Sequence, residues 1–280
     1  AAAFAKEVNV GQNIDIASNG DVYNILLIGS DTRNGWYGNS DSMILASINS
    51  QTKTIYMTSF MRDLYANIPN VGIRKLNSAY AVGGGPLLVS TIESNYRVDI
   101  DNYASVDFSS MANIIDLVGG VDLEVSTQEA GYINMYLDEQ CGLQGLNASD
   151  YYVTGGGITH LNGNQAVGFA RIRYTSRGNE HSDYGRTSRQ REILVQLMQK
   201  ARSLDATTLL AVVNNMLPLI THNIDAATLT NLIANAPSYI NYDIQTDRIP
   251  YDGLYSNLGE ELVPDFEATI NRLHQTIYGN

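Results

Sequence analysis

The sequence predicts an α/β fold, in which a single domain forms a sandwich with a central mixed β-sheet flanked by helices. Three observations support this prediction. Residues 22–29 (V-Y-N-I-L-L-I-G) form a nearly continuous apolar run, which is typical of a central strand buried on both faces. Residues 42–49 and 54–60 alternate apolar and polar positions around a polar turn, which predicts a β-hairpin. Apolar residues at helical spacing recur along much of the remaining chain.

Composition limits the classes of function. A chain of 280 residues with 44% hydrophobic and 16% charged residues can bury a substantial core. The formal net charge of −12 argues against nucleic acid as a partner, because binding to a phosphate backbone usually needs a broadly basic surface. The single cysteine, Cys141, excludes an internal disulfide and a cysteine-based zinc site. The four histidines lack H-x-H or H-x-x-x-H spacing, so metal binding by imidazole is not expected.

The domain organisation is predicted to be simple. Residues 1–20 are polar and irregular, and residues 21–280 are expected to form one domain, since no internal repeat or low-complexity linker divides them. The candidate site motifs fall within residues 22–200. Residues 201–280 are predicted to be scaffold, with helices at 206–219, 226–239 and 264–278 and an extended segment at 243–249. No apolar run reaches the length of about eighteen residues that predicts a membrane span.

Two helices are predicted before the site motifs of the second half, at 87–96 and 109–118, with strands at 102–108 and 121–125. Their apolar residues are expected to pack in the core, or alternatively to line an apolar slot; they are Leu88, Ile92, Met111, Ile114, Ile115 and Val118. The run G-G-G-P at 83–86 is expected to break a helix, and it lacks the Gly-Lys-Ser ending of a phosphate loop. Residues 128–157 are predicted to be a long loop, either a functional insertion or a mobile segment.

Arginines are concentrated in one stretch of an otherwise acidic chain. Six of the thirteen arginines lie between residues 170 and 196, namely Arg171, Arg173, Arg177, Arg186, Arg189 and Arg191. The planar guanidinium group suits phosphate oxygens better than the point charge of lysine does. The stretch is therefore expected to bind an anion, although a solvated charged helix face after a loop remains the alternative.

The spacing of these residues adds a geometric expectation. Arg171 and Arg173 are two residues apart, so they share a face only if the backbone there is extended. Asp183, Arg186 and Gln190 are three and four residues apart, which places them on one face of a helix predicted to begin near Ser182 as the N-cap. Two arginine groups on different elements are thus expected to converge on one ligand.

Acidic residues follow the predicted strands. Asp31 lies in the loop that leaves the first predicted strand, and Asp41 lies at the end of that loop. Arg62 and Asp63 follow the second strand of the predicted hairpin. Two aspartates beside arginines suit a divalent cation that a diphosphate also coordinates. The alternatives are an Asx turn at Asp31 and a strand cap at Asp41.

Six motifs together resemble the LytR-CpsA-Psr family of cell-wall glycopolymer ligases, and the resemblance covers about residues 22 to 200. In chain order these motifs are G-S-D-T-R (29–33), N-S-D-S (39–42), S-F-M-R-D (59–63), K-L-N-S-A-Y (75–80), R-I-R (171–173) and D-Y-G-R-T-S-R-Q (183–190). Any one motif is weakly specific, whereas six in order are strongly specific. The chain has Asn39 where the family usually has arginine, and residues 174–182 form a longer connection than usual.

The resemblance implies an extracytoplasmic enzyme of Gram-positive bacteria. A single-pass membrane anchor would precede the enzyme domain at its N-terminal side. Such enzymes transfer teichoic acid, capsular or other wall polysaccharide from an undecaprenyl pyrophosphate carrier to a hydroxyl of peptidoglycan or another acceptor. The polyprenyl tail would occupy an apolar tunnel between sheet and helices. A polyprenyl pyrophosphate pyrophosphatase, or a non-catalytic module that binds lipid or cell wall, is the alternative.

The resemblance also implies roles for particular residues. Asp31 and Asp41 would coordinate Mg²⁺ (or Mn²⁺). The pyrophosphate would be bound by Arg33, Arg62, Lys75, Arg171, Arg173, Asp183, Arg186 and Gln190. The catalytic group would consist of Asp41, Arg62, Asp63, Arg171 and Arg173, with Asp41 or Asp63 assisting deprotonation of the acceptor hydroxyl. This set needs no protein nucleophile, because phosphoryl transfer depends mainly on positioning and charge stabilisation.

Overall fold

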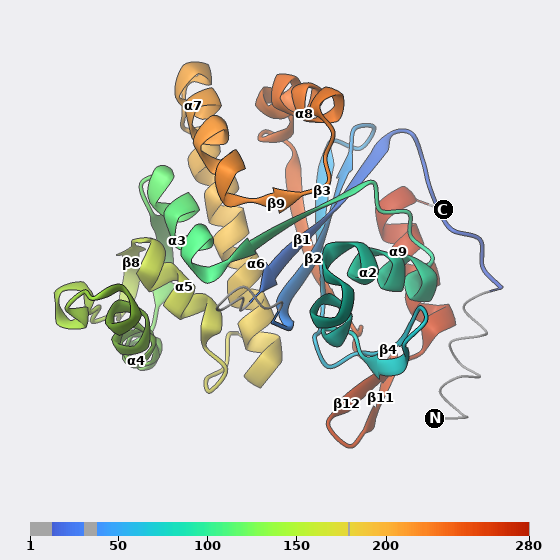
Figure 1. Cartoon of the computed structure of the whole chain (residues 1–280), viewed down its shortest axis with the longest axis horizontal. Coiled ribbons are helices and arrows are strands. Elements are labelled where there is room, and N and C mark those ends of the chain that lie inside the picture. The colour runs from blue at the N-terminus through green and yellow to red at the C-terminus, as the bar shows by residue number, and fades with distance from the viewer. Residues whose placement is uncertain (1–12, 31–37, 179, 280) are drawn as a thin grey trace. The chain divides into compact units, whose positions relative to one another are not determined.

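The computed structural model describes residues 13–30, 38–178 and 180–279 (Figure 1), and the side chains of residues 143 and 144 are not described. The chain divides into two compact units. Unit 1 takes its described residues from Ala1–Val106, Thr221–Thr230 and Tyr242–Asn280. Unit 2 comprises Asp107–Ile220 and Asn231–Asn241. The single domain predicted for residues 21–280 stays a prediction.

Unit 1 is built on a mixed sheet that, in the described part of the chain, has six strands in the order β10-β3-β2-β1-β6-β9. Their bounds are β1 Val22–Ser30, β2 Ser40–Asn49, β3 Thr54–Phe60, β6 Asn102–Asp107, β9 Thr221–His222 and β10 Asp243–Ile249. β2 pairs antiparallel with β1 and with β3, whereas β10 pairs parallel with β3. The predicted α/β class with a central mixed sheet is therefore confirmed.

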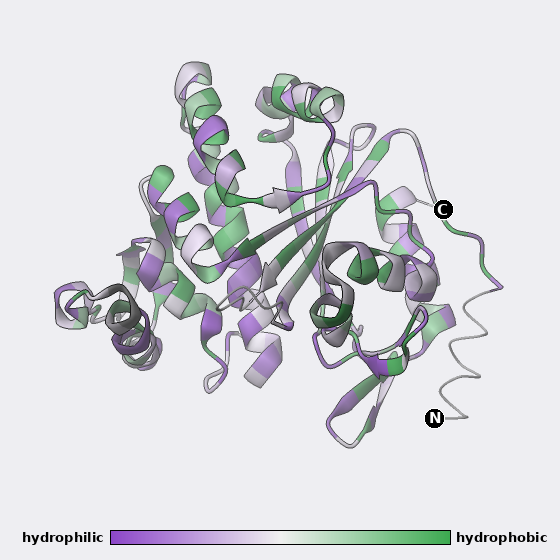
Figure 2. Ribbon diagram, in the orientation of Figure 1, coloured by the Kyte–Doolittle hydropathy of each residue, from purple (hydrophilic) through white to green (hydrophobic). Residues whose placement is uncertain are grey.

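The central strand β1 is more shielded on one face than on the other. Its residues alternate between buried and partly exposed along the whole strand, so the prediction of burial on both faces is only half right. The buried face points to α9 (Phe266–Tyr278), since the side-chain amide of Asn24 donates to the hydroxyl of Tyr278 at 2.9 Å. Figure 2 shows the corresponding hydrophobic colouring along β1 and β2.

Helix α2 (Ser78–Tyr96) also belongs to unit 1, and its core residues Leu88 and Ile92 are fully buried. These two residues therefore pack in the core, as predicted. The helix is kinked where Gly84 has a φ of 63°, which confirms that the glycine run breaks a helix. A Cβ atom on Gly85 would lie 2.4 Å from the ring of Tyr103, so close packing explains a glycine at this position.

Two short hairpins of unit 1 were not predicted. β4 (Tyr65–Ile68) pairs with β5 (Gly72–Lys75), and β11 (Tyr255–Leu258) pairs with β12 (Glu261–Pro264). The described residues ahead of β1 are irregular, as predicted. They are nevertheless attached to unit 1, because the Ala17 amide donates to the Arg97 carbonyl at 2.8 Å.

Unit 2 is mainly helical around one hairpin. Its elements are α3 Phe108–Leu117, β7 Val121–Val125, α4 Thr127–Gln144, η1 Ala148–Tyr151, β8 Gly157–Leu161, α5 Gly163–Arg171, α6 Ser182–Arg202, α7 Ala206–Met216 and η2 Leu217–Leu219. β7 and β8 pair antiparallel, and α4 packs against α5. α8 (Ala226–Tyr239) contributes residues to both units. No helix among the described residues is long and apolar enough to cross a membrane.

The prediction of a loop at 128–157 is wrong, because most of this segment forms α4. Ser126 and Glu129 make a capping box at its start, which satisfies backbone amides that a helix leaves free. Ala130, Ile133, Leu137 and Cys141, at helical spacing, are buried in the core of unit 2. The helix is therefore specified by its cap and one apolar stripe, although its other faces are rich in Gly, Tyr, Asn and Gln.

Candidate functional site

The predicted site residues are distributed over both units. Unit 1 holds Asp41, Arg62, Asp63 and Lys75, and unit 2 holds Arg171, Arg173, Asp183, Arg186 and Gln190. Asp31 and Arg33 lie outside the described residues.

In unit 1 the four residues form a chain of alternating charge. Nη1 of Arg62 lies 3.3 Å from Oδ1 of Asp41, and Nε of Arg62 lies 3.5 Å from Oδ2 of Asp63. The ammonium group of Lys75 donates to Oδ1 of Asp63 at 2.9 Å, and this hydrogen bond raises the pKa of Lys75 above its ordinary value. All four side chains remain partly exposed, so this group is accessible to solvent.

The backbone holds this group at the end of the hairpin. β2 and β3 are antiparallel, so the start of β2, which carries Asp41, lies beside the end of β3, which leads into Arg62. The Met61 amide donates to the carbonyl of Ile249 at 2.9 Å, and the Asn77 amide donates to the carbonyl of Arg62 at 3.3 Å. The turn that carries Arg62 and Asp63 is therefore fixed from both sides by main-chain hydrogen bonds.

One of the two predicted metal ligands, Asp41, lies in the described part of the chain. No three His, Cys, Asp or Glu side chains within the described ranges are arranged to hold a metal ion. Magnesium commonly takes only one or two protein carboxylates when phosphate oxygens complete its coordination. Asp41 supplies a hard oxygen donor of this kind, and it is partly exposed.

In unit 2, Arg171 is the last residue of α5, and its guanidinium group lies between two aromatic rings. It is 5.0 Å from the centroid of Phe108 and 4.5 Å from the centroid of Tyr136. Nη2 of Arg171 lies 2.9 Å from Oε2 of Glu139. Ring stacking and the ion pair thus fix the direction of a side chain that remains 17% exposed.

Asp183 connects the two other predicted arginines. Nη2 of Arg186 lies 2.9 Å from Oδ2 of Asp183, and Nε of Arg173 lies 3.7 Å from Oδ1. This contact between Asp183 and Arg186 confirms that the two residues share one helix face. Gln190, one turn further on α6, has a buried side-chain oxygen without a hydrogen-bond partner within the described part of the chain. α6 begins at Ser182 itself, with His181 as the N-cap, so the predicted cap is wrong by one residue.

The charges of Arg171, Arg173 and Arg186 all affect the pKa of the Tyr136 hydroxyl. Burial raises the pKa of Tyr136, and the positive charges of Arg171, Arg173 and Arg186 oppose this rise. The residue between Arg171 and Arg173, Ile172, has extended backbone (φ −61°, ψ 127°). Arg173 and Arg186 thus contact one carboxylate, that of Asp183, whereas Arg171 is held by Tyr136 and Glu139. That the three arginines converge on one ligand stays a prediction.

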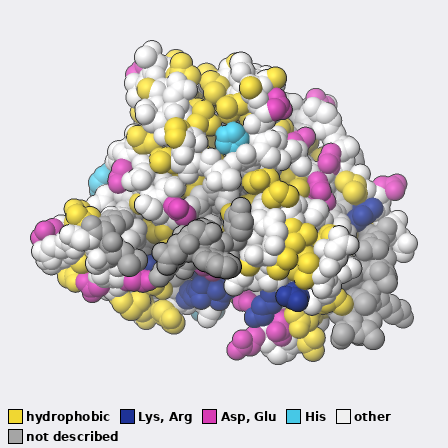
Figure 3. All heavy atoms as spheres, viewed as in Figure 1, with side chains coloured by type: hydrophobic (Ala, Val, Ile, Leu, Met, Phe, Trp, Pro, Cys, Tyr) yellow, Lys and Arg dark blue, Asp and Glu magenta, His cyan; other side chains and the backbone are white. Residues whose placement is uncertain are grey.

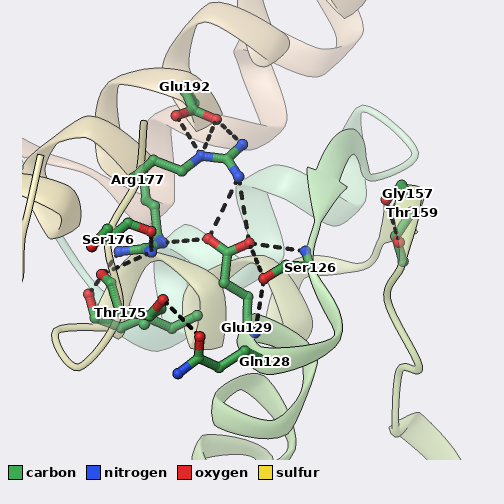
Figure 4. Close-up of polar contacts among 11 residues, drawn as sticks. Ser126, Gln128, Glu129, Gly157, Thr159, Thr175, Ser176, Arg177 and Glu192 are labelled. Carbon is green, nitrogen blue, oxygen red and sulfur yellow. Dashed lines mark hydrogen bonds and ion pairs between the residues drawn. The ribbon is translucent and has the colours of Figure 1, made fainter. Parts of the chain in front are cut away.

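The other three arginines of the stretch, Arg177, Arg189 and Arg191, are also paired with carboxylates, those of Glu129, Glu192 and Glu180. Nε of Arg189 lies 2.9 Å from Oε1 of Glu129, and both side chains are buried. Figure 4 shows Arg177 between Glu129 and Glu192. Nη2 of Arg177 lies 2.5 Å from a carboxylate oxygen of Glu192. Arg191 pairs with Glu180 at 3.4 Å. None of these three arginines is among the pyrophosphate ligands that the family resemblance implies.

The sequence interpretation missed three residues beside this site, all on α4. Glu129 binds Arg177 and Arg189, and Tyr136 and Glu139 contact Arg171. The signal for Glu129 was present in the sequence, because Ser126-x-x-Glu129 is a capping-box pattern. Nothing in the spacing identifies Tyr136 or Glu139, since their partner lies more than thirty residues further along the chain.

Charge on the molecular surface agrees with the composition. On the face drawn in Figure 3, acidic side chains are scattered, whereas Lys and Arg side chains occur in a few groups. A local arginine group in an acidic protein can attract one anionic group without making the whole surface attractive to polyanions.

The fold and the arginine group define an α/β protein that carries several arginines in its R-I-R segment and at the start of α6. The chain belongs to the LytR_cpsA_psr family, whose model matches residues 2–272. This match confirms the resemblance drawn from the six motifs.

Curated relatives of this chain are transferases and regulatory proteins of Gram-positive bacteria. The polyisoprenyl-teichoic acid–peptidoglycan teichoic acid transferase TagU of Oceanobacillus iheyensis is 37% identical over 195 residues, which cover 67% of this chain and 54% of that protein. Biofilm regulatory protein A of Streptococcus mutans is 29% identical over 215 residues, which cover 72% of this chain and 50% of that protein. The chain thus spans about half the length of these relatives.

Solved structures share the fold. Protein gbs0355 from Streptococcus agalactiae has a TM-score of 0.70 and 25% identity, covering 92% of this chain and 88% of that one. TagT solved with a bound octaprenyl pyrophosphate lipid has a TM-score of 0.65 and 21% identity, covering 97% of this chain and 96% of that one. At this identity the TagT structure supports the fold alone.

Proposed function

We propose that this chain is a phosphotransferase that moves a wall glycopolymer, such as teichoic acid or a capsular polysaccharide, from an undecaprenyl pyrophosphate carrier to a hydroxyl of peptidoglycan or another acceptor. The observation that carries this proposal is that Arg173 and Arg186 contact the same Asp183 carboxylate in unit 2, where Arg171 is held against the ring of Tyr136. The name of the TagU relative, a teichoic acid transferase that uses a polyisoprenyl-linked substrate, supports the same substrate class.

The unit 2 arginines bind the oxygens of the diphosphate in this proposal. Guanidinium groups donate two parallel hydrogen bonds to phosphate, and their charge is worth most where it meets the charge that develops in the transition state. Arg186 lies in the first turns of α6, where the positive end of the helix dipole adds to the attraction. Asp183 keeps Arg173 and Arg186 together, and Gln190 is a supporting contact.

The unit 1 group has the complementary roles. Arg62, Lys75 and Arg33 contact phosphate oxygens, and Asp41 or Asp63 accepts the proton of the acceptor hydroxyl. Asp41 and Asp31 hold Mg²⁺ (or Mn²⁺), which, when bound, offsets negative charge on the phosphate oxygens.

The proposed reaction needs no covalent intermediate on the protein. The acceptor oxygen forms a bond to the phosphorus that carries the polymer, and the bond from this phosphorus to the bridging oxygen breaks. Polyprenyl phosphate leaves, and the polymer is joined to the acceptor through a phosphodiester. The reaction belongs at the extracytoplasmic face of the cell membrane, where peptidoglycan acceptors are present, with the polyprenyl tail in an apolar tunnel of the fold.

A reconstituted transfer assay tests this proposal. The purified chain is incubated with a polyprenyl diphosphate-linked glycan, Mg²⁺ and a peptidoglycan oligosaccharide, and the products are identified by mass spectrometry. We expect the phosphodiester-linked product together with polyprenyl phosphate. Polyprenyl phosphate without the linked product would instead identify a pyrophosphatase. Lipid binding without either product would identify a non-catalytic module.

A further inference from the structure

One face of α4 contacts residues along the arginine segment 171–177. Glu129, Tyr132, Tyr136 and Glu139 are separated by three, four and three residues, which places them on one side of the helix. Their partners run in the opposite direction along the segment. Glu129 contacts Arg177, the Tyr132 ring lies 5.6 Å from the Tyr174 ring, and both Tyr136 and Glu139 contact Arg171.

The buried end of this face fixes the backbone of the segment through Arg189. Glu129 accepts the Nε hydrogen of Arg189 at 2.9 Å, which orients a guanidinium group that is fully buried. The other nitrogens of Arg189 donate to the carbonyl oxygens of Ile172, Thr175 and Ser176 at 3.3, 3.2 and 3.0 Å. Figure 4 shows Glu129 reached at once by Ser126 and by Arg177. Arg189 therefore holds the backbone of residues 172–176, and the Glu129 carboxylate on α4 fixes the orientation of Arg189.

The other end of the face fixes the first arginine of the motif. The hydroxyl of Tyr136 donates to the backbone carbonyl of Arg171 at 3.1 Å, and its ring stacks on the guanidinium group of the same residue. Tyr136 thus holds both the main chain and the side chain of Arg171. An arginine side chain loses rotamer entropy when a ligand fixes it, so fixing it before the ligand arrives favours binding.

We propose that this face of α4 is a positioning surface for the diphosphate site, and that Tyr136 and Glu129 are the residues that set how Arg171 and Arg173 meet the ligand. This inference rests on the proposed function. α4 carries none of the six family motifs found in the sequence. Substitutions on α4 are expected to change the affinity for diphosphate lipids, although Glu129 does not contact the lipid itself.

Calorimetric titration with farnesyl diphosphate tests the role of Tyr136. Tyr136→Phe removes one hydrogen bond to the Arg171 carbonyl and keeps the ring. We expect the Kd to rise about fivefold, the effect of one hydrogen bond, while the Tm falls by no more than about 3 °C. Tyr152→Phe is the matched control, because its hydroxyl bonds Asp138 on the same helix and not the arginine segment. The control should change neither quantity.

Glu129 provides a second, independent measurement. We expect Glu129→Gln to raise the Kd about tenfold or more, because the buried Arg189 loses its charged partner, and Glu129→Asp to recover part of the affinity. Amide hydrogen exchange of residues 172–177 should become faster in Glu129→Gln. If the wild-type protein binds farnesyl diphosphate and Tyr136→Phe binds it equally well, the positioning role is overturned and the proposed function stands. If the wild-type protein binds no prenyl diphosphate, both are overturned.

Discussion

Arg189 and Glu129 form a buried ion pair in which Nε of Arg189 lies 2.9 Å from Oε1 of Glu129, and the two side chains are 0% and 3% exposed. They are sixty residues apart in sequence. Ser126 and Arg177 also bind the Glu129 carboxylate, and three carbonyl oxygens accept hydrogen bonds from Arg189. A buried pair of this kind is well satisfied, so removing one partner leaves the other charge without compensation.

Glu129→Gln is therefore expected to destabilise the protein. The substitution keeps the size of the side chain but leaves Arg189 buried without its charge partner. We expect the free energy of unfolding at neutral pH to fall by on the order of 3 kcal/mol, measured by urea denaturation. Glu124→Gln is the control, since Glu124 is exposed on β7, and it should change the free energy by less than about 0.5 kcal/mol. Equal effects of the two substitutions would contradict this account.

The same pair predicts how stability depends on pH. Burial alone would raise the pKa of Glu129, but hydrogen bonds from Ser126 and Arg189 and the charge of Arg177 lower it below 4.5 overall. A carboxyl group whose pKa is lower in the folded state stabilises the protein above its unfolded pKa, and this contribution is lost as the pH falls through the folded pKa. We expect the stability difference between wild type and Glu129→Gln to be constant near neutral pH and to shrink below 4.5. Urea denaturation over a pH series measures it, and a difference that stays constant down to acid pH would argue against the lowered pKa.

Arg173 offers a test of the transfer chemistry. Its Nε lies 3.7 Å from Asp183, at the exposed side of the unit 2 arginine group. Arg173→Ala should lower the transfer rate about a hundredfold, because an arginine that meets transition-state charge is worth on the order of 3 kcal/mol. Arg173→Lys should recover only part of the loss, since lysine keeps the charge without the planar fork. Arg202→Ala, at the far end of α6, is the control and should retain full activity. A full rate in Arg173→Ala would remove this arginine from the proposed site.

The elements that the sequence predicted well are those specified locally. β1 was identified from its apolar run, and β2 and β3 from period-two alternation within each segment. α6 was identified from the three- and four-residue spacing of Asp183, Arg186 and Gln190. α4 was missed because glycine and polar residues on its exposed faces obscured a stripe of four apolar residues. The hairpin of β4 and β5 was missed because strands of four residues give too few positions for a pattern.

The site was predicted only in part for a related reason. Sequence spacing brought Asp183 and Arg186 together, since both lie on one helix. It gave no indication that Arg177 and Arg189 are neutralised by Glu129, because that contact joins residues far apart in the chain. That Arg62 and the unit 2 arginines bind the same diphosphate stays a prediction, and so do the metal ligands Asp31 and Asp41.

Metal binding at Asp41 is expected to require a phosphate. No group of three or more metal-binding side chains occurs in the described ranges of the chain, and Asp41 is already paired with Arg62 at 3.3 Å. We expect Mn²⁺, followed by electron paramagnetic resonance, to bind weakly to the protein alone and at least tenfold more tightly when inorganic diphosphate is present, because phosphate oxygens then complete the coordination. Asp41→Asn should weaken binding in the presence of diphosphate, whereas Asp252→Asn, an exposed aspartate of unit 1, should not. Tight Mn²⁺ binding without diphosphate would show instead that the protein alone provides a complete metal site.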